Sequence, residues 1–424
     1  MSKLFPMVSW AQGTNIYETN IRQYTTEGSF NAFCRHLPRL KEMGVETLWL
    51  MPITPIGVKG RLGTLGSYYA CSSYTKINPE FGNEDDFRAL IQQAHTLGMK
   101  VIIDWVTNHT GQDHEWTTAH PDFYEKDDNG NFREKNGWSD VYDLDYTNPN
   151  LRAAMVDAMQ YWVKNFDIDG FRCDMAHLVP LDFWMEARKS CDQTKPLFWL
   201  AECDDDQYLN VFDVNYAWRW MHATNALSQN KAQGLNAIVP LLHEDLELLP
   251  DACKLWFTSN HDENSWNGTE YEKYGMLART WAVFTFLFPG IPLIYSGQEL
   301  PNYKRLAFFE KDHIDWNDDA PQLQGFYQAM LHLRKQNPCF HTTATYRAIA
   351  VSHCNDTLAF ALQQDNNQVL VLFNFSHSET HMVPVQTEYL AGQYTSLFSG
   401  ISYDLQNSET FCIEPGGYLV YVKQ

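Results

Sequence analysis

Four short apolar runs each end in polar side chains of the types that catalyse group transfer. The runs lie at 102–109, 170–177, 200–202 and 258–263, and their polar residues include His109, Arg172, Asp174, Glu202, His261 and Asp262. Any one of these residues has a structural explanation, because polar residues at strand ends often cap helices or form turns. Together they supply carboxylates, imidazoles and a guanidinium. Glycosyl transfer uses such a set: one carboxyl group protonates the leaving oxygen, another attacks the anomeric carbon, and other polar groups hold sugar hydroxyls.

These residues need a scaffold that brings several strand ends together. Apolar runs of strand length alternate with segments whose apolar residues recur every three or four positions, which is typical of βα units around a parallel sheet. Strands are predicted at 15–22, 46–52, 100–105, 170–174, 197–202, 211–215, 254–259 and 291–295. Helices are predicted at 33–43, 85–97, 151–165, 276–288 and 322–335. Eight such strands predict an α/β fold, a (β/α)8 TIM barrel, whose catalytic groups lie at the carboxyl ends of the strands.

Two regions interrupt the alternation. A polar stretch containing Gly and Asp follows the third strand and predicts a short inserted excursion. Beyond about residue 342, short alternating runs separated by turn residues predict an all-β sandwich. The predicted domains are therefore a catalytic barrel at 1–109 and 146–341, an inserted domain B at 110–145, and a C-terminal β-sandwich, domain C, at 342–424.

The four segments also resemble the signature regions of glycoside hydrolase family 13, the α-amylase family, in the same order and on the corresponding strands. Supporting segments agree with this resemblance: 44–52, 290–299, and 66–69 followed by 77–82. The resemblance covers about residues 10 to 335, and the β tail is consistent with the family's domain C. It implies a retaining glycosidase that hydrolyses α-1,4-glucosidic bonds of starch-like glucans or maltodextrins through a covalent glycosyl-enzyme intermediate.

The resemblance implies a role for each matching residue. Asp174 matches the nucleophile, Glu202 the general acid/base, and Asp262 the third carboxylate, which grips sugar hydroxyls and aids ring distortion. The implied substrate-binding residues are Tyr69, His109, Arg172, His177 and His261. Strand alternation puts Arg172 and Asp174 on one face, where a guanidinium within a few Å would lower the pKa of the carboxylate and suit a nucleophile.

Two features stand apart from the matched motifs. His177 lies three residues after Asp174, where many α-amylases have Lys, so the leaving-group preference stays open. The chemistry requires no cofactor, but calcium-binding relatives imply a structural Ca2+, for which Asn108 and Asp143 match two ligands. Calcium needs six or more oxygen ligands, so a hydrogen bond from Asn108 across the excursion is the alternative interpretation.

Composition argues against several other classes of partner. The 424 residues are 44% apolar and 14% aromatic, which predicts a globular chain with a sizeable core. A formal charge of -21 argues against nucleic acid and anionic membranes. The nine cysteines show no regular spacing and predict reduced thiols. The N-terminus has no signal-peptide pattern, so a cytoplasmic location is expected, with a secreted protein whose signal peptide has been removed as the alternative. The expected partner is an α-glucan oligosaccharide or polysaccharide, and the oligomeric state is not assigned.

Other functions remain open. A 4-α-glucanotransferase or an α-glucosidase would use the same covalent intermediate with a different acceptor or substrate. A catalytically silent binding or assembly module is a remote alternative, because such relatives lose carboxylates and all three are present here. Aromatic residues in expected rim loops, including Trp105, Trp138 and Trp266, are candidates for stacking on sugars at outer subsites or for plain packing.

Overall fold

The computed structural model describes residues 3–229, 234–248, 252–316, 322–341 and 343–423. Thr342, where the sequence predicts that the C-terminal domain begins, lies outside the described residues, as do residues 1 and 424 at the outer domain limits. The chain divides into two compact units. The first comprises Met1–Ser9, Ile16–Tyr216 and Leu306–Asn317, and the second comprises Trp10–Asn15, Ala217–Arg305 and Asp318–Gln424.

Eight strands form a closed parallel barrel in the order β1, β10, β9, β8, β7, β6, β3, β2. Their bounds are β1 Ile16–Thr19, β2 Thr47–Leu50, β3 Lys100–Val106, β6 Gly170–Asp174, β7 Phe198–Ala201, β8 Val214–Tyr216, β9 Cys253–Trp256 and β10 Ile291–Tyr295. Almost every strand residue is buried, which explains why these strands read as continuous apolar runs. The predicted barrel is confirmed, and each predicted strand overlaps an observed one.

Close approach of β6 to β7 in the first unit depends on a glycine. A Cβ atom on Gly170 would lie 2.1 Å from the carbonyl oxygen of Phe198, so a larger residue would push the strands apart. On its other side β6 pairs with β3, in a register that places Arg172 opposite Asp104. Polar side chains of adjacent strands are thereby brought to the same level of the barrel.

The helices of the first unit differ in how they begin, and in four of them a side chain accepts a capping hydrogen bond at the N-terminus. Their bounds are α1 Ile21–Tyr24, α2 Phe30–Cys34, α3 Leu37–Met43, α4 Glu84–Thr96, α5 Glu115–Ala119, α6 Pro149–Phe166 and α7 Leu181–Cys191. Asn83 and Asp86 form a capping box at the start of α4. The single helix predicted at 33–43 is wrong: it is two helices, because Pro38 lies in the first turn of α3 and lacks the N–H that a continuous helix would use. Within the described ranges, no helix is long and apolar enough to cross a membrane.

The excursion after β3 carries its own small sheet. Strand β4, His109–Gly111, pairs antiparallel with β5, Val141–Asp143, so that His109 lies opposite Asp143. Helix α5 and a 3-10 turn at Pro121–Phe123 lie between these strands in the chain. The predicted short insertion is confirmed.

The second unit joins two barrel strands to the C-terminal β domain through apolar helices. Its helices are α8 Trp218–Ser228, α9 Val239–Leu246, α10 Glu270–Tyr274, α11 Ala278–Leu287 and α12 Gln324–Gln336. Every residue of α11 except Arg279 is buried. The helix packs against the β domain, where the rings of Trp281 and Phe375 stack with their centroids 3.9 Å apart. An α-helix that is apolar all round requires such burial on both sides.

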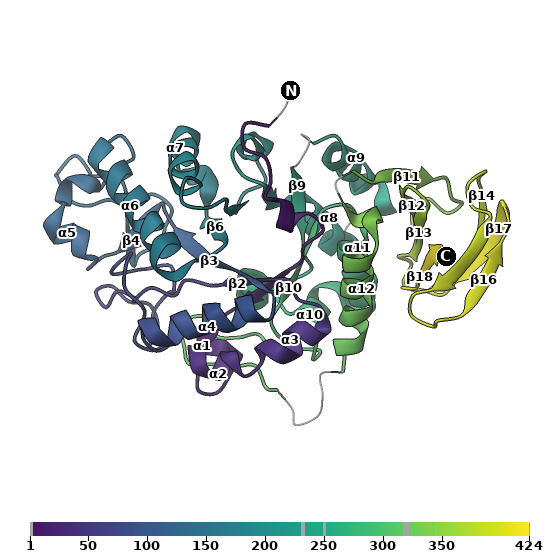
Figure 1. The fold of residues 1–424 in the computed structure, drawn as a ribbon, viewed down its shortest axis with the longest axis horizontal. Coiled ribbons are helices and arrows are strands. Elements are labelled where there is room, and N and C mark those ends of the chain that lie inside the picture. Colours follow the sequence, from purple (N-terminus) through teal and green to yellow (C-terminus); the bar gives the residue numbers. More distant parts are fainter. Residues whose placement is uncertain (1–2, 230–233, 249–251, 317–321, 342, 424) are drawn as a thin grey trace. The chain divides into compact units, whose positions relative to one another are not determined.

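The C-terminal strands form an antiparallel β domain (Figure 1). One sheet has the order β11, β12, β13, β18, β15, β16, and the other pairs β14 with β17. The bounds are β11 Thr345–Ile349, β12 Thr357–Gln364, β13 Asn367–Asn374, β14 His381–Gln386, β15 Gly392–Ser396, β16 Ser402–Leu405, β17 Ser408–Ile413 and β18 Tyr418–Lys423. One buried apolar cluster includes Leu370 and Leu372 from the first sheet and Val383 and Phe411 from the second. The two sheets therefore share a core, as the predicted sandwich requires.

A buried carboxylate ties the first unit together just before β6. One oxygen of Asp169 accepts a hydrogen bond from the Val101 backbone N–H at 2.9 Å and lies 2.7 Å from His95 Nε2. The other oxygen accepts hydrogen bonds from Lys100 and Lys195 at 3.1 and 3.2 Å. Burial alone would raise the pKa of Asp169, but these contacts outweigh it and lower the pKa to about 2. The ionised form is therefore the one that stabilises the fold.

Replacement of Asp169 by Asn should lower the free energy of unfolding by about 2–3 kcal/mol at pH 7, measured by urea denaturation. The folded-state pKa lies below the unfolded value, so the stabilisation is present above about pH 4 and is lost as the pH falls toward 2. The difference between wild type and variant should shrink over that range. Asp167→Asn is the matched control, because this exposed carboxylate also pairs with Lys195 and should contribute less than about 1 kcal/mol. Equal losses in the two variants would contradict the prediction.

Candidate active site

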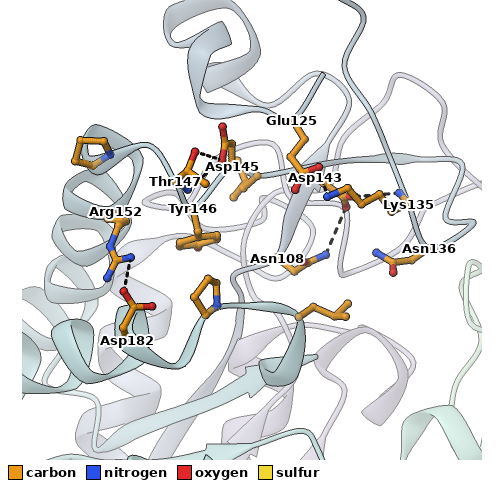
Figure 2. A pocket seen from close by; sticks show the side chains of 14 residues that line it. Asn108, Glu125, Lys135, Asn136, Asp143, Asp145, Tyr146, Thr147, Arg152 and Asp182 are labelled. Carbon is orange, nitrogen blue, oxygen red and sulfur yellow. Dashed lines mark hydrogen bonds and ion pairs between the residues drawn. The ribbon is translucent and has the colours of Figure 1, made fainter. Parts of the chain in front are cut away.

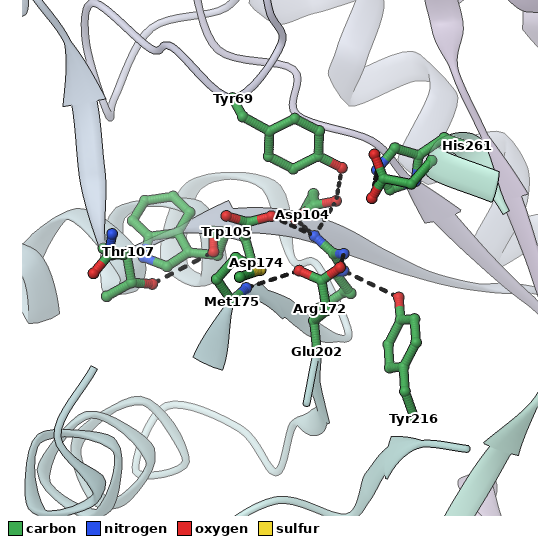
Figure 3. A network of polar contacts seen from close by, with 12 residues as sticks. Tyr69, Asp104, Trp105, Thr107, Arg172, Asp174, Met175, Glu202, Tyr216 and His261 are labelled. Atoms are coloured by element: carbon green, nitrogen blue, oxygen red, sulfur yellow. Dashed lines mark hydrogen bonds and ion pairs between the residues drawn. The ribbon is translucent and has the colours of Figure 1, made fainter. Parts of the chain in front are cut away.

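One buried guanidinium gathers three carboxylates at the ends of β3, β6 and β7 (Figure 3). Arg172 Nη1 lies 2.9 Å from Asp104 Oδ1 and 3.0 Å from Asp174 Oδ1, and Nη2 lies 2.8 Å from Glu202 Oε1. The contact with Glu202 is an ion pair without the alignment of a hydrogen bond. Burial would lower the pKa of Arg172, but the carboxylates of Asp104 and Glu202 raise it well above its usual value. The arginine is therefore a permanent positive charge at the centre of the cluster.

Strand geometry explains why these side chains meet. Arg172 and Asp174 are two residues apart on β6 and point to the same face. Glu202 directly follows β7, and its backbone N–H donates to the carbonyl of Cys173 on β6 at 3.0 Å. The structure thus brings Glu202 to Arg172 and Asp174, which the sequence had already placed together on one face of another strand.

Asp104 is the residue of this cluster to which the sequence assigned no role. Its side chain is fully buried, and Oδ2 accepts hydrogen bonds from the Trp49 indole N–H at 3.1 Å and from the Tyr69 hydroxyl at 3.0 Å. A signal was present in the sequence, because an aspartate inside an apolar strand must be paired when buried. Asp104 therefore orients both the arginine and the tyrosine.

The carboxyl group of Glu202 is held from two sides. Oε1 faces the Arg172 guanidinium, and Oε2 accepts a hydrogen bond from the backbone N–H of Met175 at 2.8 Å. Met175 has a φ angle of 41°, in the left-handed region that non-glycine residues rarely adopt. Such conformations cost on the order of 1 kcal/mol and cluster at functional sites. The residue directly after Asp174 thus points its amide at Glu202.

Two candidate sugar-binding residues of the first unit are Tyr69, in the loop that follows β2, and His109, the first residue of β4. Tyr69 is half-buried, and its ring lies parallel to Phe308 at 6.3 Å between centroids. His109 is buried, with its ring 5.1 Å from that of Trp138. Burial lowers the pKa of His109 to about 4, so its imidazole is neutral at neutral pH. A neutral imidazole has one donor and one acceptor, which suits a sugar hydroxyl.

His177 has an exposed side chain in a 3-10 turn, Ala176–Leu178, that follows β6. Its backbone is fixed, since its carbonyl accepts a hydrogen bond from the Tyr208 hydroxyl at 3.2 Å. The side chain is therefore presented to solvent two residues beyond Met175.

His261 and Asp262 lie in the second unit, after β9. His261 is buried, and its Nε2 lies 3.3 Å from Asp262 Oδ2, while the Asp262 side chain is 37% exposed. A π-helical turn, η6 Glu263–Asn267, begins immediately afterwards, and Asn260 accepts a hydrogen bond from the Glu263 backbone N–H at 2.8 Å. The pair follows the carboxyl end of β9, and Asp174 is the last residue of β6, so all three residues lie at carboxyl ends of barrel strands.

The three aromatic residues that the sequence offered for sugar stacking differ in exposure. Trp105 is part of β3 and 1% exposed, with its ring 5.3 Å from Tyr74 and 5.7 Å from Phe171. Its expected place in a rim loop is wrong, because the strand runs through Val106 and the indole packs in the core. Trp138 is half-buried, and Trp266 is 52% exposed.

Asn108 and Asp143 line a pocket of about 800 Å³ at the insertion (Figure 2). Asn108 Nδ2 lies 3.5 Å from Asp143 Oδ1, and the other oxygen of Asp143 accepts a hydrogen bond from the Lys135 backbone N–H at 3.0 Å. Burial, reinforced by Glu134 and Glu125, raises the pKa of Asp143 to about 6. The buried carboxylate thus has one well-bonded oxygen and one with only a long contact.

Ca2+ takes six or more oxygen ligands, and the Asn108 and Asp143 side chains would supply two of them. The Asn108 atom that faces Asp143 is the amide nitrogen, so the amide would have to present its oxygen instead, and backbone carbonyls and water would have to complete the set. Lys135, in the same pocket, pairs with Glu125. In the part of the chain that the structure describes, no group of three or more His, Cys, Asp or Glu residues is placed to hold a metal ion. Asn108 and Asp143 would therefore provide two ligands of a Ca2+ site that the His, Cys, Asp and Glu side chains of the described residues do not complete.

Comparison with known proteins adds to this geometry. A family model described as the α-amylase catalytic domain matches residues 11–139 and 123–325. The solved structure of a noncanonic maltogenic α-amylase, AmyB from Thermotoga neapolitana, is 30% identical with a TM-score of 0.88, covering 98% of this chain and 99% of that chain. The α-amylase MalA from Haloarcula japonica is 26% identical over 91% of this chain, which spans 59% of the length of MalA. The intracellular maltogenic amylase of Bacillus subtilis is 24% identical over 93% of this chain and 69% of its own length.

Proposed function

The chain belongs to the α-amylase family, and we propose that it is a retaining glycosidase that hydrolyses α-1,4-glucosidic bonds in maltodextrins and starch-like glucans. The observation that carries the proposal is the contact of one buried arginine, Arg172, with both Asp174 and Glu202. Retaining glycosidases require two such carboxyl groups beside one glycosidic bond. The substrate class follows the names of the relatives, and the name of the B. subtilis relative supports action inside the cell.

In the first step, an oxygen of Asp174 attacks the anomeric carbon while the bond from that carbon to the leaving sugar breaks. Glu202 gives its proton to the leaving oxygen, so the leaving sugar departs neutral. Arg172 holds Asp174 Oδ1 at 3.0 Å and favours the ionised nucleophile that the attack needs. The hydrogen bond from the Met175 N–H holds the Glu202 carboxyl group in one orientation.

In the second step, Glu202 takes a proton from water as the water oxygen attacks the anomeric carbon. The ester bond to Asp174 breaks, and the product is released with retained configuration. Tyr69 stacks on the sugar ring at the cleavage position, and His109, His261 and Asp262 hold its hydroxyls. His177 contacts the leaving-group side, where its exposed imidazole replaces the lysine of many family members.

A time course of products from maltoheptaose tests the function. Hydrolysis predicts only products shorter than the substrate, with the α-anomer formed first in the NMR spectrum. Products longer than maltoheptaose would instead identify a 4-α-glucanotransferase, and release of glucose from maltose would favour an α-glucosidase. If no reducing sugar appears from any maltooligosaccharide, the chain is a silent module and the proposal fails.

The proposal includes a structural Ca2+ at the insertion, held by Asn108 and Asp143. Support comes from the buried Asp143 carboxylate, whose Oδ1 has only a 3.5 Å contact with the Asn108 amide. Asn108 directly precedes β4 and Asp143 is the last residue of β5, so a bound cation would cross-link the insertion to the segment that leaves β3. Addition of Ca2+ to chelator-treated protein should raise the melting temperature. An unchanged melting temperature in excess chelator and in excess Ca2+ would reject the metal.

A further inference from the structure

Two strongly exposed aromatic side chains lie on the loops that follow β9 and β10. Tyr303 is 69% exposed and Trp266 is 52% exposed, more than any other large aromatic side chain in the described ranges. Single exposed aromatics are common and need no explanation, but a group of them marks a binding surface. The loops that carry them follow the carboxyl ends of barrel strands, where substrates bind in this architecture.

The two loops are fastened to each other and to α10. The Asn264 amide donates to the carbonyl of Lys304 at 3.1 Å. Arg305 bonds both oxygens of Glu272 at 2.8 and 3.1 Å. The ring of Tyr303 lies 4.3 Å from that of Tyr271, between centroids, at an angle of 34°. Tyr303 is therefore exposed on a supported loop and is backed by a second ring.

The turn that carries Trp266 is tied to α10 by a buried ion pair. Trp266 belongs to the π-helical turn η6, whose Glu263 pairs with Lys273 of α10 at 2.7 Å, and both charged residues are at most 2% exposed. Asn267 donates to the other oxygen of Glu263 at 2.8 Å. Such π-helical segments are rare and occur frequently at functional sites. A buried ion pair costs desolvation, and here it holds the turn that presents an indole to solvent.

We propose that Trp266, Tyr303 and Tyr271 form an aromatic platform that binds glucose units of an α-glucan beyond the cleavage position. The inference rests on the proposed function for the identity of the sugar. Aromatic faces stack on the apolar face of a pyranose ring, and tyrosine hydroxyls meet its polar edge. Four charged groups of these loops and of α10 are paired, Arg305 with Glu272 and Lys273 with Glu263, which suits a neutral ligand. Trp266 lies four residues after Asp262, so a chain bound near Asp262 has a short path to the platform.

The test measures binding and turnover as a function of chain length. In the Asp174→Asn background, Trp266→Ala or Tyr303→Ala should weaken maltoheptaose binding about threefold to tenfold by calorimetry. In otherwise wild-type protein, the ratio of kcat/KM for maltoheptaose to that for maltotriose should fall by a similar factor. Tyr403→Ala is the matched control, because Tyr403 is an exposed tyrosine on β16 in the C-terminal sheet. This control should leave both quantities unchanged.

Each other outcome overturns the platform. If Trp266→Ala behaves like the Tyr403 control, the aromatic residues do not bind glucan. If kcat/KM falls by the same factor for maltoheptaose and for maltotriose, the substitution acts at the cleavage position. If light scattering shows a dimer that Trp266→Ala dissociates without changing sugar binding, the occupant is a second copy of the chain. Failure of the proposed function is a distinct result. A protein that binds maltoheptaose through Trp266 but releases no reducing sugar would support the platform and contradict the proposed hydrolase activity.

Discussion

Replacement of Asp174 by Asn is expected to lower kcat on maltoheptaose by about 10^4-fold or more, because an amide cannot form the glycosyl ester. The change removes one negative charge from Arg172, whose guanidinium keeps Asp104 and Glu202 as partners. The fold should therefore survive, and the melting temperature should fall much less than if a lone buried charge were left. Reducing-sugar release under single-turnover conditions is the measurement, since it reports the first chemical step.

The matched control for this variant is Asp182→Asn. Asp182 is an exposed carboxylate in the first turn of α7 that pairs with Arg152 on the surface. Its replacement removes the same charge from the same unit, and turnover should change less than twofold. A variant at 174 that retains wild-type rates on maltooligosaccharides would rule out Asp174 as the nucleophile.

Parts of this cluster follow from strand geometry alone. Residues two apart on a strand share a face, so the proximity of Arg172 and Asp174 follows once 170–174 is recognised as a strand. Glu202 is different, because its contact with Arg172 depends on the register and on the close approach of β6 and β7, and the close approach requires a glycine at position 170. No periodicity in the sequence reports the register between strands that are separated by a helix.

Other features required the three-dimensional structure. Asp104 reads as one polar residue in an apolar strand, and only its contacts with Arg172, Tyr69 and Trp49 show why it is tolerated there. Trp105 is of a residue type that can stack on sugars. Side chains alternate between the two faces of a strand, however, and in β3 this alternation buries the Trp105 indole in the core. The left-handed conformation of Met175 has no sequence signal, since residues other than glycine and asparagine rarely adopt it. Such conformations are held by surrounding contacts, here with Glu202.

The second large effect is expected from Glu202→Gln, which should lower kcat/KM on maltoheptaose about 10^3-fold. Glutamine retains an acceptor oxygen for the Met175 N–H but has no acidic proton for the leaving oxygen. The loss should depend on the leaving group. A dinitrophenyl glycoside of maltose leaves as a stable anion, so its first step needs no proton from residue 202.

With that activated substrate, Glu202→Gln should form the ester to Asp174 almost as fast as the wild type and then hydrolyse it slowly, because the same residue must act as base in the second step. A burst of dinitrophenolate equal to the enzyme concentration, followed by a slow steady state, is the expected signature. Glu202→Asp gives a control that keeps an acid but shortens its reach, and it should restore turnover on maltoheptaose only in part. If the natural and the activated substrate are slowed equally and without a burst, Glu202 is not the acid/base. Its contact with Arg172 would then have to be explained as part of the structure that holds Asp174.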